Sequence, residues 1–221
     1  MKRLQVKVCP HDANGFMPPC QFDNPVTAGS LLISPGDGGC EDFSCRYVSD
    51  SQTNGWTFAL SGLSYALNAK PGLTTVFFTS GTRWNNIAEY PPSTGLEGVS
   101  SATYSDAGLT PAGVEIHDSA GWTGVHTPGQ TGLHPLETHE PCELLISWAL
   151  AGQNFVGPVP VIAGPGFTMR TNNPFPNNSG SIAFEDATAT VPGYQFASMR
   201  WRYPNAWEER IAAFKMGSCP Q

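Results

Sequence analysis

The sequence contains the same four-residue motif twice, once in each half of the chain. Leu-Leu-Ile-Ser occupies positions 31–34 and 144–147, and the second copy lies in the longest apolar run, residues 142–152. That run is bounded by Pro141 and Gly152 and is too short to cross a membrane. A short apolar run between such breakers is typical of a strand buried on both faces. We therefore predict that the two motifs form the central strands of a two-sheet structure.

Glycine and proline limit the secondary structure of the remaining chain. The sequence has 24 glycines and 20 prolines among 221 residues, and both residue types interrupt helices. Residues 63–68 are ambiguous and fit one helical turn. Alternating or β-branched segments predict strands at residues 3–8, 56–60, 74–79, 86–90, 166–170, 181–185, 194–200 and 210–215. The expected fold class is all-β, an antiparallel two-sheet β-sandwich with long loops.

We expect a single domain over residues 1–221, because no linker separates one part of the sequence from another. Within it we distinguish an N-terminal arm that contains cysteines, residues 1–20, and a long His-rich loop region, residues 93–141. Long irregular stretches inside compact domains are usually functional loops. No apolar segment of the signal-peptide type follows Met1, so we expect no signal peptide in this sequence.

The charge of the sequence and the length of its apolar segments argue against two classes of partner. Only 13% of the residues are charged, and the formal net charge is −7. A nucleic-acid-binding surface needs clustered lysine and arginine, and the sequence has no such cluster. No segment approaches the about 20 apolar residues of a membrane-spanning helix. We therefore expect neither nucleic acid nor a membrane as a partner.

The cysteines are even in number and crowd toward the N-terminus. The six are Cys9, Cys20, Cys40, Cys45, Cys142 and Cys219. In an oxidising compartment they would form three disulfides, whose pairing the spacing does not determine. The spacing between the third and fourth is poor for zinc. We expect disulfides, and free thiols or metal ligation remain the alternatives.

Several short sequence segments occur in the same order as in a known protein family. They lie at positions 24–33, 48–52, 56–57, 87–90, 142–146, 164–170, 183–186, 193, 207 and 211–214. Together, over residues 21–215, they resemble the concanavalin-A-like domains found in bacterial surface proteins and phage structural proteins. The resemblance implies a two-sheet antiparallel jelly roll. It implies no single activity, because this fold serves lectins, hydrolases and scaffolds.

The acids do not form a recognisable catalytic pattern. The glucanase branch of the family places Glu-x-Asp-x-Glu along one strand, so that alternate carboxyls enter one cleft, and this triplet is absent. Glu89, Glu185 and Asp186 lie in predicted strands, and we expect structural roles for them, with Arg170 or Arg200 as ion-pair partners. Nucleophile-elbow and phosphate-loop motifs are also absent from the sequence. We therefore expect no catalytic residue and no enzymatic activity.

Two clusters contain metal-binding residue types without a decisive spacing. The first comprises His117, His126, His134 and His139. No pair among them has the helical i, i+4 spacing of a zinc site, so we expect surface or interface histidines. The second, in a glycine-rich loop with oxygen ligands suited to calcium, comprises Asp37, Glu41 and Asp42. We expect a disulfide-pinned turn there, no cofactor, and metal binding only as the weaker alternative at both clusters.

Aromatic residues in loops are the main binding candidates. They are Trp84, Trp122, Trp201, Tyr203 and Trp207. Exposed Trp and Tyr rings stack on sugars and anchor protein interfaces. We expect these residues to contact glycan or a protein partner, whereas Trp56 and Trp148 lie within strands and should belong to the core.

These observations predict a non-enzymatic structural or surface module of a repeating assembly, most simply a virion decoration (capsid cement) or tail component. Its expected partners are copies of itself and other capsid or tail subunits, contacted by residues 110–140 and the N-terminus, on a virion or extracellular surface. One alternative is a secreted, lectin-like carbohydrate-binding module that recognises cell-surface glycan. The other is a polysaccharide-cleaving enzyme.

Overall fold

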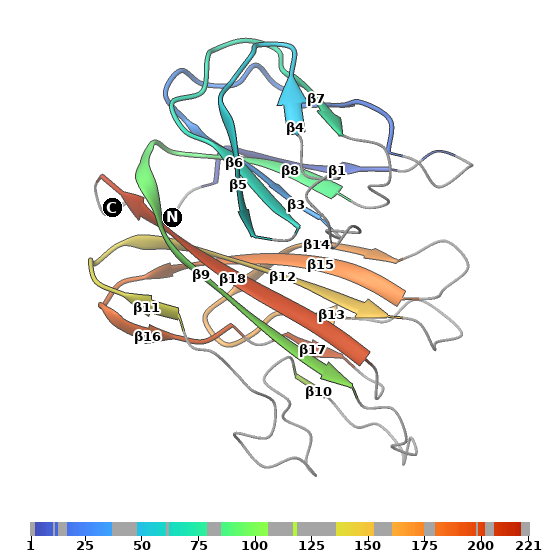
Figure 1. Cartoon of the computed structure of the whole chain (residues 1–221), viewed down its shortest axis with the longest axis vertical. Coiled ribbons are helices and arrows are strands. Elements are labelled where there is room, and N and C mark those ends of the chain that lie inside the picture. The colour runs from blue at the N-terminus through green and yellow to red at the C-terminus, as the bar shows by residue number, and fades with distance from the viewer. Residues whose placement is uncertain are drawn as a thin grey trace. The chain divides into compact units, whose positions relative to one another are not determined.

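The described part of the protein is built from antiparallel strands. The computed structural model describes residues 3–10, 12, 17–36, 48–60, 62–78, 85–105, 117–118, 136–152, 161–174, 180–197, 199–201 and 206–217. These residues form two five-stranded sheets, two three-stranded sheets and one two-stranded ribbon (Figure 1). They include no helix long and apolar enough to span a bilayer. The predicted all-β, antiparallel class is confirmed for this part of the chain.

The chain divides into two compact units. Unit 1 comprises Met1–Leu96 together with Phe214–Gln221, and unit 2 comprises Glu97–Ala213. Two strands, β9 (Ser93–Ser105) and β18 (Ala206–Met216), belong to both units, because the boundary falls inside each of them.

Unit 1 contains a five-stranded sheet of order β1-β8-β3-β6-β5 and a three-stranded sheet of order β2-β7-β4. The strands are β1 (Gln5–Cys9), β2 (Cys20–Gln21), β3 (Leu31–Pro35), β4 (Val48–Asp50), β5 (Trp56–Leu60), β6 (Leu63–Ala66), β7 (Thr75–Phe78) and β8 (Asn85–Tyr90). Apolar side chains from both sheets form one buried core, which includes Phe22, Leu32, Val76 and Ile87. The two sheets are therefore layers of one small sandwich.

A disulfide between Cys9 and Cys20 joins the edge strands of these two layers, with the Cα atoms 5.6 Å apart. Cys142 in unit 2 is also disulfide-bonded. The prediction of disulfides is confirmed for these three residues. Cys40, Cys45 and Cys219 lie outside the described residues.

The helical turn that fitted residues 63–68 is wrong, because Leu63–Ala66 is strand β6. Gly62 has a φ of 79°, which closes a tight connection between β5 and β6. Strand β6 then pairs with β5 on one side and with β3 on the other. These two ladders satisfy its backbone groups, and the local sequence alone does not reveal them.

Unit 2 contains a five-stranded sheet of order β14-β15-β12-β18-β9, a three-stranded sheet of order β10-β17-β13, and a ribbon of β11 and β16. Besides β9 and β18, its strands are β10 (His117–Asp118), β11 (Leu136–Thr138), β12 (Glu143–Gly152), β13 (Val161–Ile162), β14 (Thr168–Pro174), β15 (Gly180–Ala189), β16 (Gly193–Gln195) and β17 (Arg200–Trp201). Leu136 of the ribbon packs with Leu145 and Ile211 of the five-stranded sheet. The ribbon therefore covers part of one face of that sheet.

The two Leu-Leu-Ile-Ser motifs occupy equivalent places. The first lies in β3 and the second in β12, and each of these strands is the middle one of its five-stranded sheet. All eight residues are buried. The prediction that the motifs form central strands is confirmed.

Residues 93–105, which we expected to belong to a long loop, form strand β9 instead. This strand lies at the edge of the unit 2 sheet, with β18 as its neighbour. An edge strand tolerates Gly, Ser and Thr better than a central one, because it has fewer neighbouring side chains to pack against. The weak apolar pattern of this segment therefore concealed a strand.

Asp50 organises the turn between β4 and β5. Its Oδ1 accepts hydrogen bonds from the backbone amides of Gln52 at 2.8 Å and Asn54 at 3.2 Å. Its Oδ2 accepts from Asn54 Nδ2 at 2.9 Å and from Trp56 Nε1 at 2.6 Å. The carboxylate thus fixes both the turn and the indole of Trp56, which packs against the unit 1 core.

We expect Asp50→Asn to lower the free energy of unfolding by about 2 kcal/mol, because the amide replaces one charged acceptor with a donor. Urea denaturation followed by circular dichroism measures this loss. Asp23→Asn is the matched control, since Asp23 forms an exposed ion pair with Lys7 and such pairs contribute little. Equal effects of the two substitutions would show that the Asp50 turn has no special role.

Candidate functional site

Three polar side chains form a row across three neighbouring strands of unit 2, which we call the acid row: Glu185, Ser147 and Glu209. Glu185 on β15 lies directly opposite Ser147 on β12. The Ser147 hydroxyl donates a hydrogen bond to Glu209 Oε1 on β18 at 2.7 Å. All three residues are buried, and Glu185 and Ser147 have no exposed surface. The row therefore places two carboxyls on one buried sheet face.

Glu185 is held by one described backbone donor. The amide of Gly164 donates to Glu185 Oε2 at 2.9 Å, and Oε1 has no hydrogen-bond partner among the described residues. Burial raises the pKa of Glu185 from its ordinary value of 4.5 to about 8. Repulsion from Glu209 adds to this rise, and the Gly164 amide opposes it. Glu185 is therefore protonated at neutral pH.

A third buried carboxyl lies on β12, the strand that carries Ser147. Glu143 is fully buried at the start of β12, and burial raises its pKa to about 7, with a further rise from neighbouring Glu97. Glu97 Oε1 accepts a hydrogen bond from the backbone amide of His139 at 3.0 Å and lies 2.5 Å from its Nδ1. Only the His139 ring is exposed. This arrangement connects a solvent-exposed imidazole with two buried carboxyls.

The other acids that the sequence singled out have structural partners. Asp186 forms a two-pronged ion pair with Arg170, with contacts of 2.8 Å and 2.6 Å, as expected for one of its two candidate partners. Glu89 accepts hydrogen bonds from Gln5 Nε2 at 2.6 Å and from the Thr27 amide at 2.7 Å. Glu89 lies in the unit 1 sheet and Glu185 in the unit 2 sheet, so the two carboxyls do not share a sheet face.

The outer face of the β11–β16 ribbon exposes large apolar side chains. Tyr194 is 63% exposed and Phe196 is 57% exposed, and alternation along the extended chain places both on the same side. Val191, in the preceding turn, is 68% exposed. Gln195 turns the other way and donates to Thr138 Oγ1 at 3.1 Å. We call Val191, Tyr194 and Phe196 the aromatic surface.

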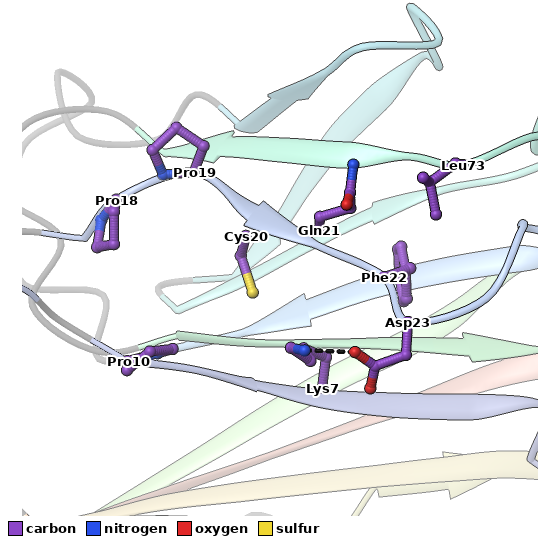
Figure 2. Close-up of a pocket in the computed structure, with 9 residues that line it drawn as sticks. All are labelled: Lys7, Pro10, Pro18, Pro19, Cys20, Gln21, Phe22, Asp23 and Leu73. Carbon is purple, nitrogen blue, oxygen red and sulfur yellow. Dashed lines mark hydrogen bonds and ion pairs between the residues drawn. The ribbon is translucent and has the colours of Figure 1, made fainter.

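A pocket of about 340 Å³ lies in unit 1, beside the edge strands that the disulfide joins (Figure 2). An ion pair between Lys7 and Asp23 lies along one side of it. The remaining lining is mainly proline and apolar, from Pro10, Pro18, Pro19, Cys20, Gln21, Phe22 and Leu73. The pocket thus offers shape and apolar contact, with a single pair of charges.

The structure brings together two of the residues that the sequence selected for binding. Backbone pairing places His117 on β10 opposite Trp201 on β17. Trp207 lies in β18, and His139 contacts Glu97 as described. The other candidates lie outside the described residues: Trp84, Trp122, Tyr203, His126, His134, Asp37, Glu41 and Asp42. Within the described ranges, no group of three or more His, Cys, Asp or Glu side chains is arranged to hold a metal ion.

Comparison with known proteins identifies no relative: no family model matches the chain, and neither the curated proteins nor the solved structures contain a match.

Sequence reasoning missed the aromatic surface and two of the buried glutamates. Tyr194 and Phe196 were recognised only as alternate positions of a predicted strand. Glu143 directly precedes the apolar residues Leu144–Ile146, and a carboxyl beside such a run was the available signal, whereas Glu209 lies between Glu208 and Arg210 and had no comparable signal.

Proposed function

We propose that this chain is a non-enzymatic structural module that joins copies of itself in a repeating assembly, such as a virion decoration or tail component, through the aromatic surface. The observation that carries the proposal is the exposure of Tyr194 and Phe196 on one face of the ribbon. Clustered exposed aromatic residues mark protein interfaces, where their rings supply much of the binding energy.

Two further features support a structural role. The buried carboxyls of the acid row lie where a polymer substrate does not reach them, since Glu185 has no exposed surface and Glu209 is 4% exposed. Disulfides of the Cys9–Cys20 type persist mainly outside the reducing cytosol. Both features suit a rigid module on a virion or extracellular surface, and a jelly-roll arrangement of the sheets is part of this proposal.

The double variant Tyr194→Ser/Phe196→Ser tests the proposal. We expect the unchanged protein to self-associate, and to do so more strongly at high salt, because its net charge of −7 opposes association. Loss of each ring should weaken association by about 2 kcal/mol, or roughly 30-fold in Kd. Sedimentation velocity over a range of protein concentrations measures both effects.

Val8→Ser/Phe77→Ser is the matched control, because it removes two exposed apolar side chains of unit 1 that lie outside the aromatic surface. The control should associate like the unchanged protein. A monomer at every concentration and salt level, or association that survives loss of both rings, would contradict the proposal.

Glycan binding is the second candidate function, and one observation favours it. Glu137, which is exposed, lies directly opposite Tyr194 across the ribbon. An aromatic ring that stacks on a sugar and a carboxylate that accepts hydrogen bonds from the hydroxyls of that sugar form a common recognition pair. Binding on a glycan array that is lost in Tyr194→Ser and in Glu137→Gln, without any change in association state, would favour this function over the first.

A further inference from the structure

The same face of the unit 2 sheet contains three buried glutamates. Glu143 and Ser147 are four residues apart on β12 and therefore point to the same face. Glu185 and Glu209 flank Ser147 on the neighbouring strands. Burial of several carboxyls against one apolar core is costly unless protons or hydrogen bonds neutralise them.

We propose that the acid row and Glu143 form a proton-dependent lock on the core of unit 2, which keeps the turn at residues 164–167 closed at mildly acidic pH and releases it as the pH rises. The lock is a conformational device that is independent of which partner or ligand the protein binds.

The turn at residues 164–167 covers Glu185 and holds it. The Gly164 amide donates to the carboxyl, and Phe167 packs against the apolar core of the same sheet face. The Phe167 amide donates to the Gly164 carbonyl at 3.1 Å, and Gly166 adopts a φ of 81°, so the turn is a compact element. An ionised Glu185 needs water, which reaches Oε1 when this turn moves away.

The elements around the lock contribute few compensating charges. Besides Glu185 and Glu143, the charged or titratable groups on the described elements of unit 2 are Glu208, Glu209 and Arg210 on β18, Asp186 on β15, Arg170 on β14, Glu97 and Tyr104 on β9, His139 and Glu140 before β12, Glu137 on β11, Tyr194 on β16, Arg200 on β17, and His117 and Asp118 on β10. Arg170 is occupied by Asp186. The residues of the covering turn, 164–167, contain no titratable side chain.

The direction of the pH effect follows from the raised pKa values. The pKa is about 8 for Glu185 and about 7 for Glu143 in the closed structure, against an ordinary value of 4.5. Above pH 4.5 the closed form therefore retains protons that the open form releases. The opening equilibrium should rise by up to roughly tenfold per pH unit for each carboxyl, and it should level off above the pKa of the closed form.

Hydrogen exchange of the full chain, followed by mass spectrometry, tests the lock in one-unit steps from about pH 5 to about pH 9. After correction for intrinsic exchange rates, peptides that contain the turn at residues 164–167, and those from β12 and β15, should open progressively more as the pH rises. Peptides from β3 and β8 in unit 1 are the internal reference and should show a much flatter dependence.

Glu185→Gln mimics the protonated carboxyl. It should remove the contribution of Glu185 to the rise of the opening equilibrium of β12 and β15 with pH, which is up to roughly tenfold per pH unit. Glu137→Gln makes the same charge change on the exposed face and should leave the slope intact. If Glu185→Gln does not fold by circular dichroism, Glu143→Gln should flatten the slope up to about pH 7. A flat response of the unchanged protein, or an unaltered slope in a folded lock variant, would overturn the proposal.

Discussion

Replacing Trp148 by alanine should lower the free energy of unfolding by about 4 kcal/mol, the largest loss that we expect from one substitution. Trp148 lies in β12, the central strand of the unit 2 sheet, and has no exposed surface. Phe184 of β15 lies opposite it and is also fully buried. Truncation would remove a large apolar side chain and leave a cavity that the flanking strands cannot easily fill. Guanidinium denaturation followed by circular dichroism measures the loss.

Trp148→Phe separates packing from polarity at the same site. The indole Nε1 of Trp148 is buried and has no hydrogen-bond partner in the described part of the chain, so phenylalanine removes a costly polar group while it keeps much of the apolar volume. We expect this variant to lose about 1–2 kcal/mol. Losses of the same size in the alanine and phenylalanine variants would mean that ring packing is not what Trp148 contributes.

The sequence was most informative where a strand is buried on both faces. The motifs at 31–34 and 144–147 have apolar residues at successive positions, a pattern typical of a strand buried on both faces, and both strands are central in their sheets. Strand β5 was predicted with its observed bounds, Trp56–Leu60, because its aromatic and apolar residues alternate. Local pattern and tertiary position agree in these elements.

Elements whose stability comes from distant neighbours were harder to predict. Strand β9 carries glycine and serine at many positions, and its partner, β18, lies about a hundred residues later in the chain. The local sequence of strand β6 fits a helical turn, because the strands that pair with it, β3 and β5, lie outside that local sequence. The pairing of distant segments is a tertiary property, and a single sequence carries little direct information about it.

The candidate site was unpredictable for a related reason. Alternation in residues 194–200 predicts a strand, but it does not show whether Tyr194 faces the core or solvent until the ribbon with β11 forms. Glu185 was recognised as a strand acid, yet its neighbours Ser147 and Glu209 come from two other strands. The chemistry of such a group depends on side chains that only the folded sheet assembles.

Replacing both Cys9 and Cys20 by alanine should lower the free energy of unfolding of unit 1 by about 3 kcal/mol. The disulfide closes a loop with a sequence separation of 11 and joins the edge strands β1 and β2, which belong to different sheets. Strand β2 has only two residues and pairs with β7 alone, so it depends on this link more than β1 does. Hydrogen exchange should therefore increase first in β2 and β7, while β12 in unit 2 stays protected. Reduction of the unchanged protein with dithiothreitol should reproduce the exchange increase in β2 and β7. A double variant as stable as the oxidised protein would show that the shared apolar core and the hydrogen bonds between Gln5 and Asn24 suffice to hold the two layers together.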